Sequence, residues 1–305
     1  MKRYILKRVV QGIITLVGVS IVVFLLIHLN GDPVALLLPA EATPEAHAAL
    51  RKELRLDEPL YVQYGIFLLN ALQGDFGTSL RWNRPALEVF AERFPNTVLL
   101  ASAAMAWSLL IGVTMGVMSA VHEGNWIDRI ARIVATVGQA TPVFWLGIML
   151  ILLFSVKLGW FPTSGIGGPQ HLVLPSLTLG LAFAAGTMRL TRSTMLDVLD
   201  RDYIKLARIK GVPEHQVIVR HALLNALIPV FTVAAMDFVV LMSGTVITEY
   251  IFNWPGVGGL VAESIFARDY STIQTTLLVL SIVIVVTNVI VDIVYTYIDP
   301  RIELE

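Results

Sequence analysis

Two aspartates within long apolar stretches are the side chains best placed to do chemistry in this chain. Asp237 lies in the apolar stretch 227–247, and Asp292 lies in the stretch 274–298. A carboxylate surrounded by hydrocarbon is costly unless it faces protein or water. Such residues therefore often mark ion paths, cargo sites or proton relays. For Asp292, nearer the end of its stretch, snorkelling or helix packing is the favoured explanation.

Asp237 is the stronger candidate of the two. We expect it to line a translocation path with Met236 and Ser243 and to meet a cationic group such as an ammonium. The alternative is a protonated or paired aspartate at a subunit interface. Asp237 and Asp292 could also be the pair of an intramembrane aspartyl protease, whose carboxylates share a proton. Their depths differ by about 6 Å along the membrane normal, and no Gly-x-Gly-Asp motif is present, so this pairing is not favoured.

The composition indicates that the natural solvent of the chain is a bilayer. Of the 305 residues, 56% are hydrophobic and 15% are charged, and the mean hydropathy is +0.73. An ordinary soluble protein of this length is less apolar. The net charge of −1 provides no basic field for nucleic acid. The sequence contains no cysteine, which excludes disulfides, thiol catalysis and thiolate metal sites, and we predict no metal site.

Six stretches are long and apolar enough to cross the hydrocarbon, which takes about 20 helical residues. The fourth is the weakest, because Pro175 and several glycines interrupt it. Lipid leaves no partner for open backbone, and the alternating pattern of barrel strands is missing. We therefore predict an all-α polytopic membrane protein. Its six transmembrane helices are expected at 9–29, 97–121, 131–156, 172–190, 227–247 and 274–298.

The distribution of lysine and arginine predicts the orientation. Fourteen of the 22 basic residues lie on the face that carries both chain ends. The other face carries six in the segment 30–96, which is too long for its charges to influence topology much, plus Lys157 and Arg268. We therefore predict cytoplasmic N- and C-termini.

The segment 30–96 is predicted to be a small extracytoplasmic helical insertion, with helices at 44–56 and 61–72. The chain would then consist of an N-terminal region, 1–96, and a five-helix transmembrane domain, 97–305. A cleaved secretory signal is the alternative for the first helix. That helix is longer than the apolar core of a signal peptide, and the cleavage-like Ala40-Glu41-Ala42 lies well beyond its end.

The cytoplasmic loop at about 191–226 carries the most specific pattern. A helix there would carry three basic residues on one face: Arg201, Lys205 and Arg208. It would carry three apolar residues on another: Tyr203, Leu206 and Ala207. Gly211 predicts a left-handed end to this helix, and Pro213 predicts the start of the next. Such a short amphipathic helix suits a groove in another protein, and the alternative is a positive loop lying on anionic headgroups.

The residues of this loop resemble those of bacterial ABC-importer permeases, in the branch that handles dipeptides, oligopeptides, glutathione and nickel. The resembling stretches of the loop are 202–212 (DYIKLARIKGV) and 220–230 (RHALLNALIPV). Further resembling motifs follow in order along nearly the whole chain: Gly31-Asp32-Pro33, 56–60 (LDEPL), Gly74-Asp75-Phe76-Gly77, Leu174-Pro175, 252–258 (FNWPGVG), Arg268-Asp269-Tyr270 and Asp299-Pro300-Arg301.

The resemblance implies a non-catalytic subunit that forms half of the translocation pathway for small peptides in the bacterial inner membrane. It implies as partners a second, homologous permease, two ATPase subunits that use ATP and Mg, and an extracytoplasmic binding protein. No cofactor is expected in this chain, which has no G-x-x-x-x-G-K-[ST] phosphate loop. The resemblance assigns coupling to the ATPases to seven residues: Asp202, Tyr203, Lys205, Leu206, Ala207, Arg208 and Gly211.

One departure concerns the broader importer signature Glu-Ala-Ala, three residues, Gly. Counted back from Gly211, its first two slots hold Lys205 and Leu206, so the ATPase contacts of those slots stay open. Three residues outside are candidates for contacts with the binding protein or an outer gate: Glu249, Trp254 and Glu263. A solvated loop is the alternative there. The competing functions are a nickel or metal-chelate importer permease, and a membrane scaffold.

Overall fold

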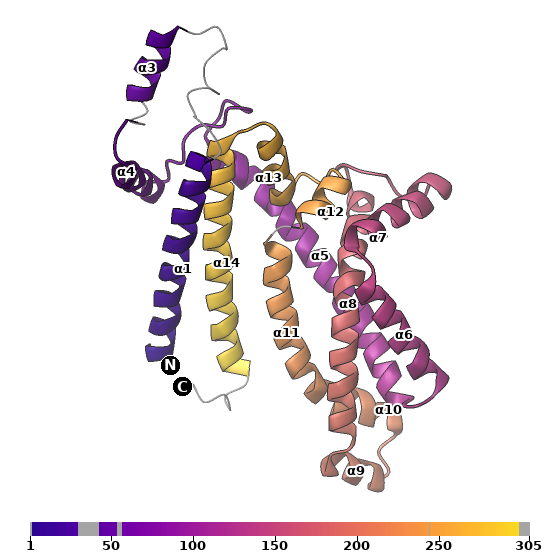
Figure 1. The fold of residues 1–305 in the computed structure, drawn as a ribbon. Coiled ribbons are helices and arrows are strands. Elements are labelled where there is room, and N and C mark those ends of the chain that lie inside the picture. The colour runs from indigo at the N-terminus through magenta and orange to yellow at the C-terminus, as the bar shows by residue number, and fades with distance from the viewer. Residues whose placement is uncertain (1, 30–42, 54–56, 244, 299–305) are drawn as a thin grey trace. The chain divides into compact units, whose positions relative to one another are not determined.

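The computed structural model describes residues 2–29, 43–53, 57–243 and 245–298. Across these ranges the chain contains helices and one isolated β-bridge, between Thr78 and Pro85, so the all-α prediction is confirmed. Five of the described helices are long and apolar enough to cross a membrane, and a bent pair makes a sixth. The elements, labelled in Figure 1, are α1 (Lys2–Leu29), α3 (Pro44–Glu53), α4 (Leu60–Leu72), α5 (Ala86–Val121), α6 (Trp126–Ala140), α7 (Val143–Leu150), the π-helix η1 (Ile151–Lys157), α8 (Pro169–Leu199), α9 (Asp202–Ile209), α10 (Glu214–Gln216), the π-helix η2 (Val217–Leu223), α11 (Leu224–Met242), α12 (Val246–Ile251), α13 (Val257–Phe266) and α14 (Tyr270–Ile298).

Several sequence predictions concern residues outside the described ranges. These are the motifs Gly31-Asp32-Pro33, Ala40-Glu41-Ala42 and Asp299-Pro300-Arg301, and the end of the predicted helix 44–56. The side chain of Asp292 is likewise not described, although its backbone belongs to α14. The predicted helix 61–72 is confirmed as α4, which begins directly after Pro59.

The chain divides into two units, the first of which holds residues 1–95 and 260–289. Within this unit α1 packs closely on α14, where a Cβ added to Gly12 would lie 2.6 Å from Cγ1 of Val285. The helix α4 is fixed to α1 by a 2.8 Å hydrogen bond between the hydroxyls of Ser20 and Tyr64. The ring of Tyr64 also contacts Phe24 edge-on at 5.4 Å between centroids.

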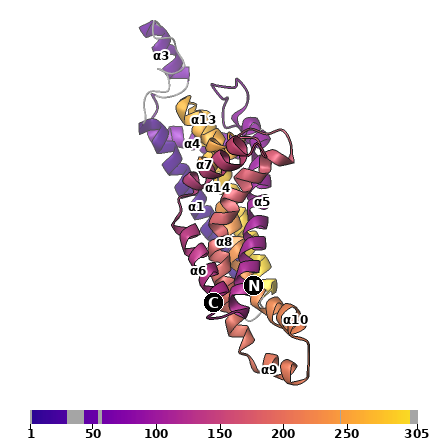
Figure 2. The ribbon, with the colours of Figure 1, turned by 90° about the vertical axis from the view of Figure 1, so that its right-hand side faces the viewer.

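The second unit holds residues 96–259 together with the described residues 290–298. Its central helix is α8, which packs against α6 and α11. Glycines let α5 and α8 approach closely: a Cβ added to Gly112 would lie 2.6 Å from Cβ of Thr187, and one added to Gly116 would lie 2.6 Å from Cβ of Thr191. Small residues spaced four apart commonly allow such close packing between membrane helices. Figure 2 shows α5, α6 and α8 running together towards the end of the unit that carries α9 and α10.

The predicted third transmembrane helix, 131–156, is wrong in one respect: it is not straight. The chain breaks between α6 and α7 and turns by 105°. The break falls at Pro142, which lacks an N–H and disfavours the helical conformation for Thr141, found here at φ −80° and ψ 122°.

The fourth and fifth predicted transmembrane helices differ in outcome. The predicted helix 172–190 is confirmed within α8, which runs without a break through Pro175. Proline is tolerated within membrane helices when neighbouring groups satisfy the freed backbone. The predicted fifth helix, 227–247, is too long, because α11 ends at Met242 and α12 forms a separate short helix.

Candidate functional site

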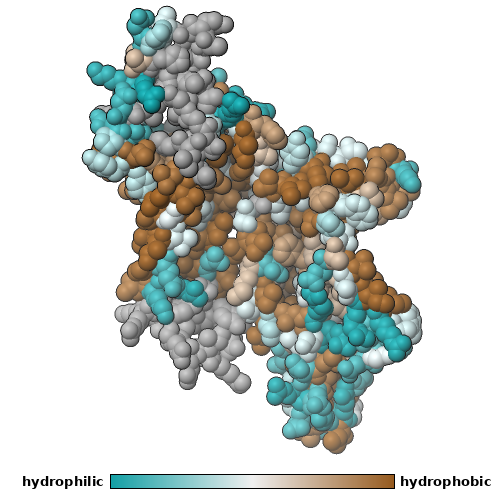
Figure 3. All heavy atoms as spheres, viewed as in Figure 1, coloured by the Kyte–Doolittle hydropathy of each residue, from teal (hydrophilic) through white to brown (hydrophobic). Residues whose placement is uncertain are grey.

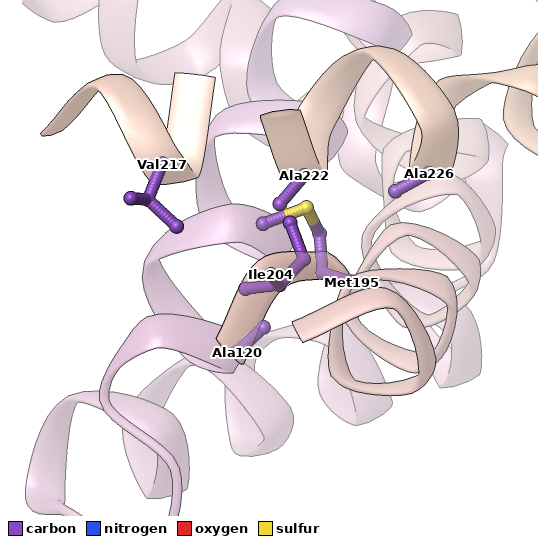
Figure 4. Packing of buried hydrophobic residues seen from close by; sticks show 6 residues of the cluster. All are labelled: Ala120, Met195, Ile204, Val217, Ala222 and Ala226. Carbon is purple, nitrogen blue, oxygen red and sulfur yellow. The ribbon is translucent and has the colours of Figure 1, made fainter. Parts of the chain in front are cut away.

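The loop helix α9 is attached to its own unit through one fully buried side chain. Ile204 has no exposed surface and packs into a cluster formed by α5, α8, α9, η2 and α11 (Figure 4). The other buried members of this cluster are Ala120, Met195, Val217, Ala222 and Ala226. Because so many elements meet at Ile204, α9 is fixed to the ends of the long helices.

The opposite side of α9 is apolar and exposed. Tyr203 is 46% exposed, Leu206 51% and Ile209 82%. The predicted apolar patch is therefore partly wrong: Ala207 packs against the internal cluster, and Ile209 takes its place on the outside. The helix is short and must satisfy its own core first, so only the residues pointing away from Ile204 stay available. An exposed apolar surface of this kind suits burial against a partner.

The predicted basic stripe is largely neutralised by neighbouring carboxylates. Lys205 Nζ lies 2.9 Å from Asp200 Oδ1, and Arg208 Nη2 lies 2.7 Å from Glu214 Oε1. Hydrogen bonding to Asp200 raises the pKa of Lys205, and the reciprocal bond lowers the pKa of Asp200. The charges of α9 are thus held within the loop, so its exposed apolar residues are the more distinctive feature.

The turn that ends α9 forms as predicted. Gly211 has φ +80°, the left-handed conformation that glycine adopts without strain. Its N–H donates to the carbonyl of Arg208 at 2.9 Å, and that of Val212 donates to Ala207 at 3.2 Å. Pro213 directly precedes α10. The turn therefore sets the direction of the chain as it leaves α9.

A buried ion pair joins α6 and α8, and the sequence analysis missed it. Asp128 is 1% exposed and accepts two hydrogen bonds from Arg192, at 2.8 and 3.1 Å. Ser119 Oγ donates to the same carboxylate at 2.6 Å, and the N–H of Gly124 donates at 3.1 Å. The available signal was Asn125, which caps α6 three residues before Asp128. The pair ties together the ends of α5, α6 and α8 near α9.

Asp237 lies within α11 and is partly buried. Across the described residues its carboxylate has no hydrogen bond or ion pair, which leaves it available for a ligand. Met236 is 53% exposed, and the exposed Ser243 donates to the carbonyl of Val240 at 2.7 Å. Met236 and Ser243 are two turns apart and share a face, whereas Asp237 lies about 100° around the helix from Met236. The structure therefore does not bring all three to one face.

The expectation that Glu249 and Trp254 contact an outside partner is corrected. Glu249 is fully buried, accepts from Thr97 Oγ1 at 3.0 Å and accepts from the N–H of Gly259 at 2.9 Å. Trp254 is 3% exposed and donates from Nε1 to the carbonyl of Asn96 at 3.0 Å. Both side chains hold the segment between α12 and α13 in place, because the glycines there let the backbone close around the carboxylate.

Glu263, in the first unit, lies 3.7 Å from both Arg81 and Arg93. Its side chain is 28% exposed, so it is reachable but paired. Nearby, the fully buried Asp269 accepts from Thr272 Oγ1 at 2.8 Å and from the hydroxyl of Ser79. Together these contacts fix the segment from Thr78 to Pro85 against the chain between α13 and α14.

Comparison with known proteins identifies the family. Residues 112–304 match the family described as the binding-protein-dependent transport system inner membrane component, and residues 1–101 match the N-terminal part of such components. The chain belongs to this family. The predicted resemblance to importer permeases is thereby confirmed, as is a multi-pass inner-membrane protein.

Similar proteins extend over the whole length of this permease. It is 44% identical over 303 residues to the glutathione transport system permease protein GsiC of Salmonella choleraesuis (strain SC-B67), covering 99% of each chain. The GsiC protein of Escherichia coli (strain K12) is 43% identical over the same length and coverage.

Solved structures show the shared fold. The MetNI methionine ABC transporter, in inward-facing conformations, gives a TM-score of 0.59 at 16% identity, covering 69% of this chain and 96% of that chain. An amino acid ABC transporter with histidines gives 0.54 at 14% identity, covering 69% and 94%.

Proposed function

We propose that this permease forms one half of the membrane pathway of an ATP-driven importer of small peptides, and that glutathione is the first cargo to test. The observation that carries the proposal is the 44% identity to a glutathione permease over 99% of both chains. The second half of the pathway would be a homologous permease. Two ATPase subunits would hydrolyse ATP with Mg, and an extracytoplasmic binding protein would deliver the cargo. This chain itself would bind no cofactor.

The loop helix α9 is the proposed handle for the ATPases. Its inner side chain, Ile204, is buried in the permease, while Tyr203, Leu206 and Ile209 are exposed. A partner that binds the outer side can therefore move the ends of α5, α8 and α11 through the inner side. To shift the two conformers of a permease from 1:99 to 99:1, nucleotide must favour one of them by about 5.5 kcal/mol. A rigid, internally packed helix transmits such a preference better than a loose loop.

We propose cytoplasmic termini, which puts α9 on the side of the ATPases. The chain contains no cysteine, so single cysteines can report this directly. A cysteine at Lys210 should react with an impermeant maleimide only after the membrane is opened. A cysteine at Arg268 should react in intact cells stripped of the outer membrane, and the reverse pattern would contradict the topology.

Asp237 is the proposed contact for a positive group of the cargo. Its carboxylate lies in an apolar helix without a hydrogen bond or ion pair among the described residues, and a peptide ammonium would supply the missing charge. Glutathione and dipeptides share this ammonium, so the contact would serve the whole class of cargo rather than one peptide.

Uptake by the assembled importer tests the proposal. The two permeases, the ATPases and the binding protein would be reconstituted in vesicles, and labelled glutathione, a dipeptide and nickel would be supplied with ATP. We expect ATP-dependent accumulation of glutathione or the dipeptide, and none with an ATPase variant that cannot hydrolyse ATP. Uptake of nickel alone would support the metal importer instead, and transport without ATPases would refute the mechanism.

A further inference from the structure

The helix α6 is buried on one side only. Asp128, Ala131 and Ala135 face α8 and are at most 5% exposed. Four large apolar side chains on the rest of the helix are between 49% and 62% exposed: Ile130, Ile133, Val134 and Val137. In a protein of the inner membrane these side chains must meet either lipid or another protein.

Two hollows adjoin along this exposed side. The first has a volume of about 420 Å³ and is bounded by α5, α6, α7 and α8, with the apolar residues Met115, Val134, Trp145 and Leu181 in its lining. The second has a volume of about 410 Å³ and is lined by Arg129, Arg132, Ile133, Thr136 and Val137. Ile133 and Val137 line both, so a basic hollow and an apolar hollow meet at these two residues.

The arginines of the basic hollow retain unused donors. Arg132 Nε lies 3.4 Å from Asp128, but that carboxylate already accepts two shorter bonds from Arg192. The side chain of Arg132 is 53% exposed, and within the described chain Arg129 makes no ion pair or hydrogen bond through its exposed side chain. The Asp128 charge is therefore balanced by Arg192, and two guanidinium groups remain for an anion.

We propose that these joined hollows bind an anionic phospholipid, with its phosphate at Arg129 and Arg132 and an acyl chain in the apolar hollow beside Val134 and Trp145. The order along α6 fits this occupant. The arginines lie towards the start of the helix, whereas the lining of the apolar hollow extends past the bend to Trp145 and Leu146. Figure 3 shows hydrophilic residues gathered mostly at the lower end of the unit that carries α9, with hydrophobic residues above them. All lining residues of the basic hollow belong to α6, and basic side chains near a membrane surface attract anionic headgroups. A free anion would use only the arginines, and a peptide would not need the adjoining apolar hollow.

Native mass spectrometry of the permease complex tests the proposal. The complex would be released from nanodiscs that contain equal amounts of phosphatidylglycerol and phosphatidylcholine with the same acyl chains. We expect retained phosphatidylglycerol. Arg129→Gln and Arg132→Gln should each lower the preference for it about fivefold, whereas Lys157→Gln, at the far end of the same bent helix pair, should not. The measurement needs no transport, so its failure is separate from failure of the proposed function.

The apolar half of the site has its own pair of variants. Val137→Trp fills the place where the hollows meet and should reduce retention of both lipids, whereas Ile130→Trp, exposed on the same helix but outside both hollows, should not. Millimolar inorganic phosphate should leave retention unchanged, and displacement by it would reduce the site to an anion site. Equal retention in all variants, or a Val137→Cys crosslink to the second permease, would overturn the lipid assignment.

Discussion

A single exposed residue of α9 provides the sharpest test of how this permease meets its ATPases. We expect Leu206→Asp to remove ATPase binding while leaving the folded permease intact. Leu206 is 51% exposed, so the free energy of unfolding should change by less than about 0.5 kcal/mol. In the complex, burying the half of the Leu206 side chain that is still exposed contributes about 1 kcal/mol to the free energy of binding. Desolvating a carboxylate against an apolar groove costs about 1 kcal/mol or more in addition.

These two contributions total about 2 kcal/mol, which lowers the affinity for the ATPase about 30-fold or more. Titration of purified ATPase against the permease pair in nanodiscs measures this, and thermal unfolding checks the fold. Ile166→Asp is the matched control, since Ile166 is 52% exposed in the segment just before α8, away from α9. Ile204→Ala should show the opposite pattern, with a loss of about 2–5 kcal/mol in stability from the buried cluster. Wild-type ATPase affinity of Leu206→Asp would refute the assignment of the outer side of α9.

Three other substitutions test the remaining parts of the structure. Gly116→Ala should lower the free energy of unfolding, measured by chemical denaturation, by about 1–3 kcal/mol, because the new Cβ would meet Cβ of Thr191 at 2.6 Å and the carbonyl of Met188 at 2.8 Å. Its control is Gly186→Ala, where a new Cβ would have no atom within 4 Å, and the same assay should show a neutral or stabilising effect. Asp128→Ala should lower the free energy of unfolding by about 3–5 kcal/mol, since it leaves the Arg192 guanidinium without its buried partner. In a double-mutant cycle, Asp128→Ala/Arg192→Ala should cost less than the sum of the two single effects. Asp237→Asn should raise the KM for peptide uptake roughly tenfold at unchanged expression, because a hydrogen bond to a charged group is worth about 1.5–3 kcal/mol; an unchanged KM would contradict a role in recognising the cargo.

The elements that depend on local rules could be predicted from the sequence. Apolar runs long enough to cross the hydrocarbon predicted the long helices. Gly211 followed by Pro213 predicted the end of α9, because these residues act on the backbone next to them. Local signals alone do not predict the 105° bend between α6 and α7. Pro142 makes a bend possible, whereas Pro175 lies in an unbroken helix, and only the packing around each proline distinguishes them.

The buried polar groups could not be predicted, because burial depends on residues distant in the chain. The sequence predicts Glu249 to be an exposed acidic residue of an outer loop. In the structure it is buried, and Thr97, 152 positions away, is one of its hydrogen-bond partners. Asp128 carries only a weak helix-capping signal, while Arg192, 64 positions further on, completes the pair. The apolar residues of α9 can be found in the sequence. Which of them faces inward depends on how α9 packs against η2 and the end of α5, and this packing involves residues distant in the chain.

The bend between α6 and α7 also bears on how the chain enters the bilayer. A helix of 15 residues such as α6 rises only about 22 Å, short of the roughly 30 Å of hydrocarbon. The stretch 131–156 therefore has enough residues to cross the hydrocarbon only when α6 and the limb formed by α7 and η1 are taken together. If α6 enters from the membrane surface, the bend at Pro142 lies within the thickness of the bilayer, so the backbone groups freed there must find their partners in protein and not in lipid.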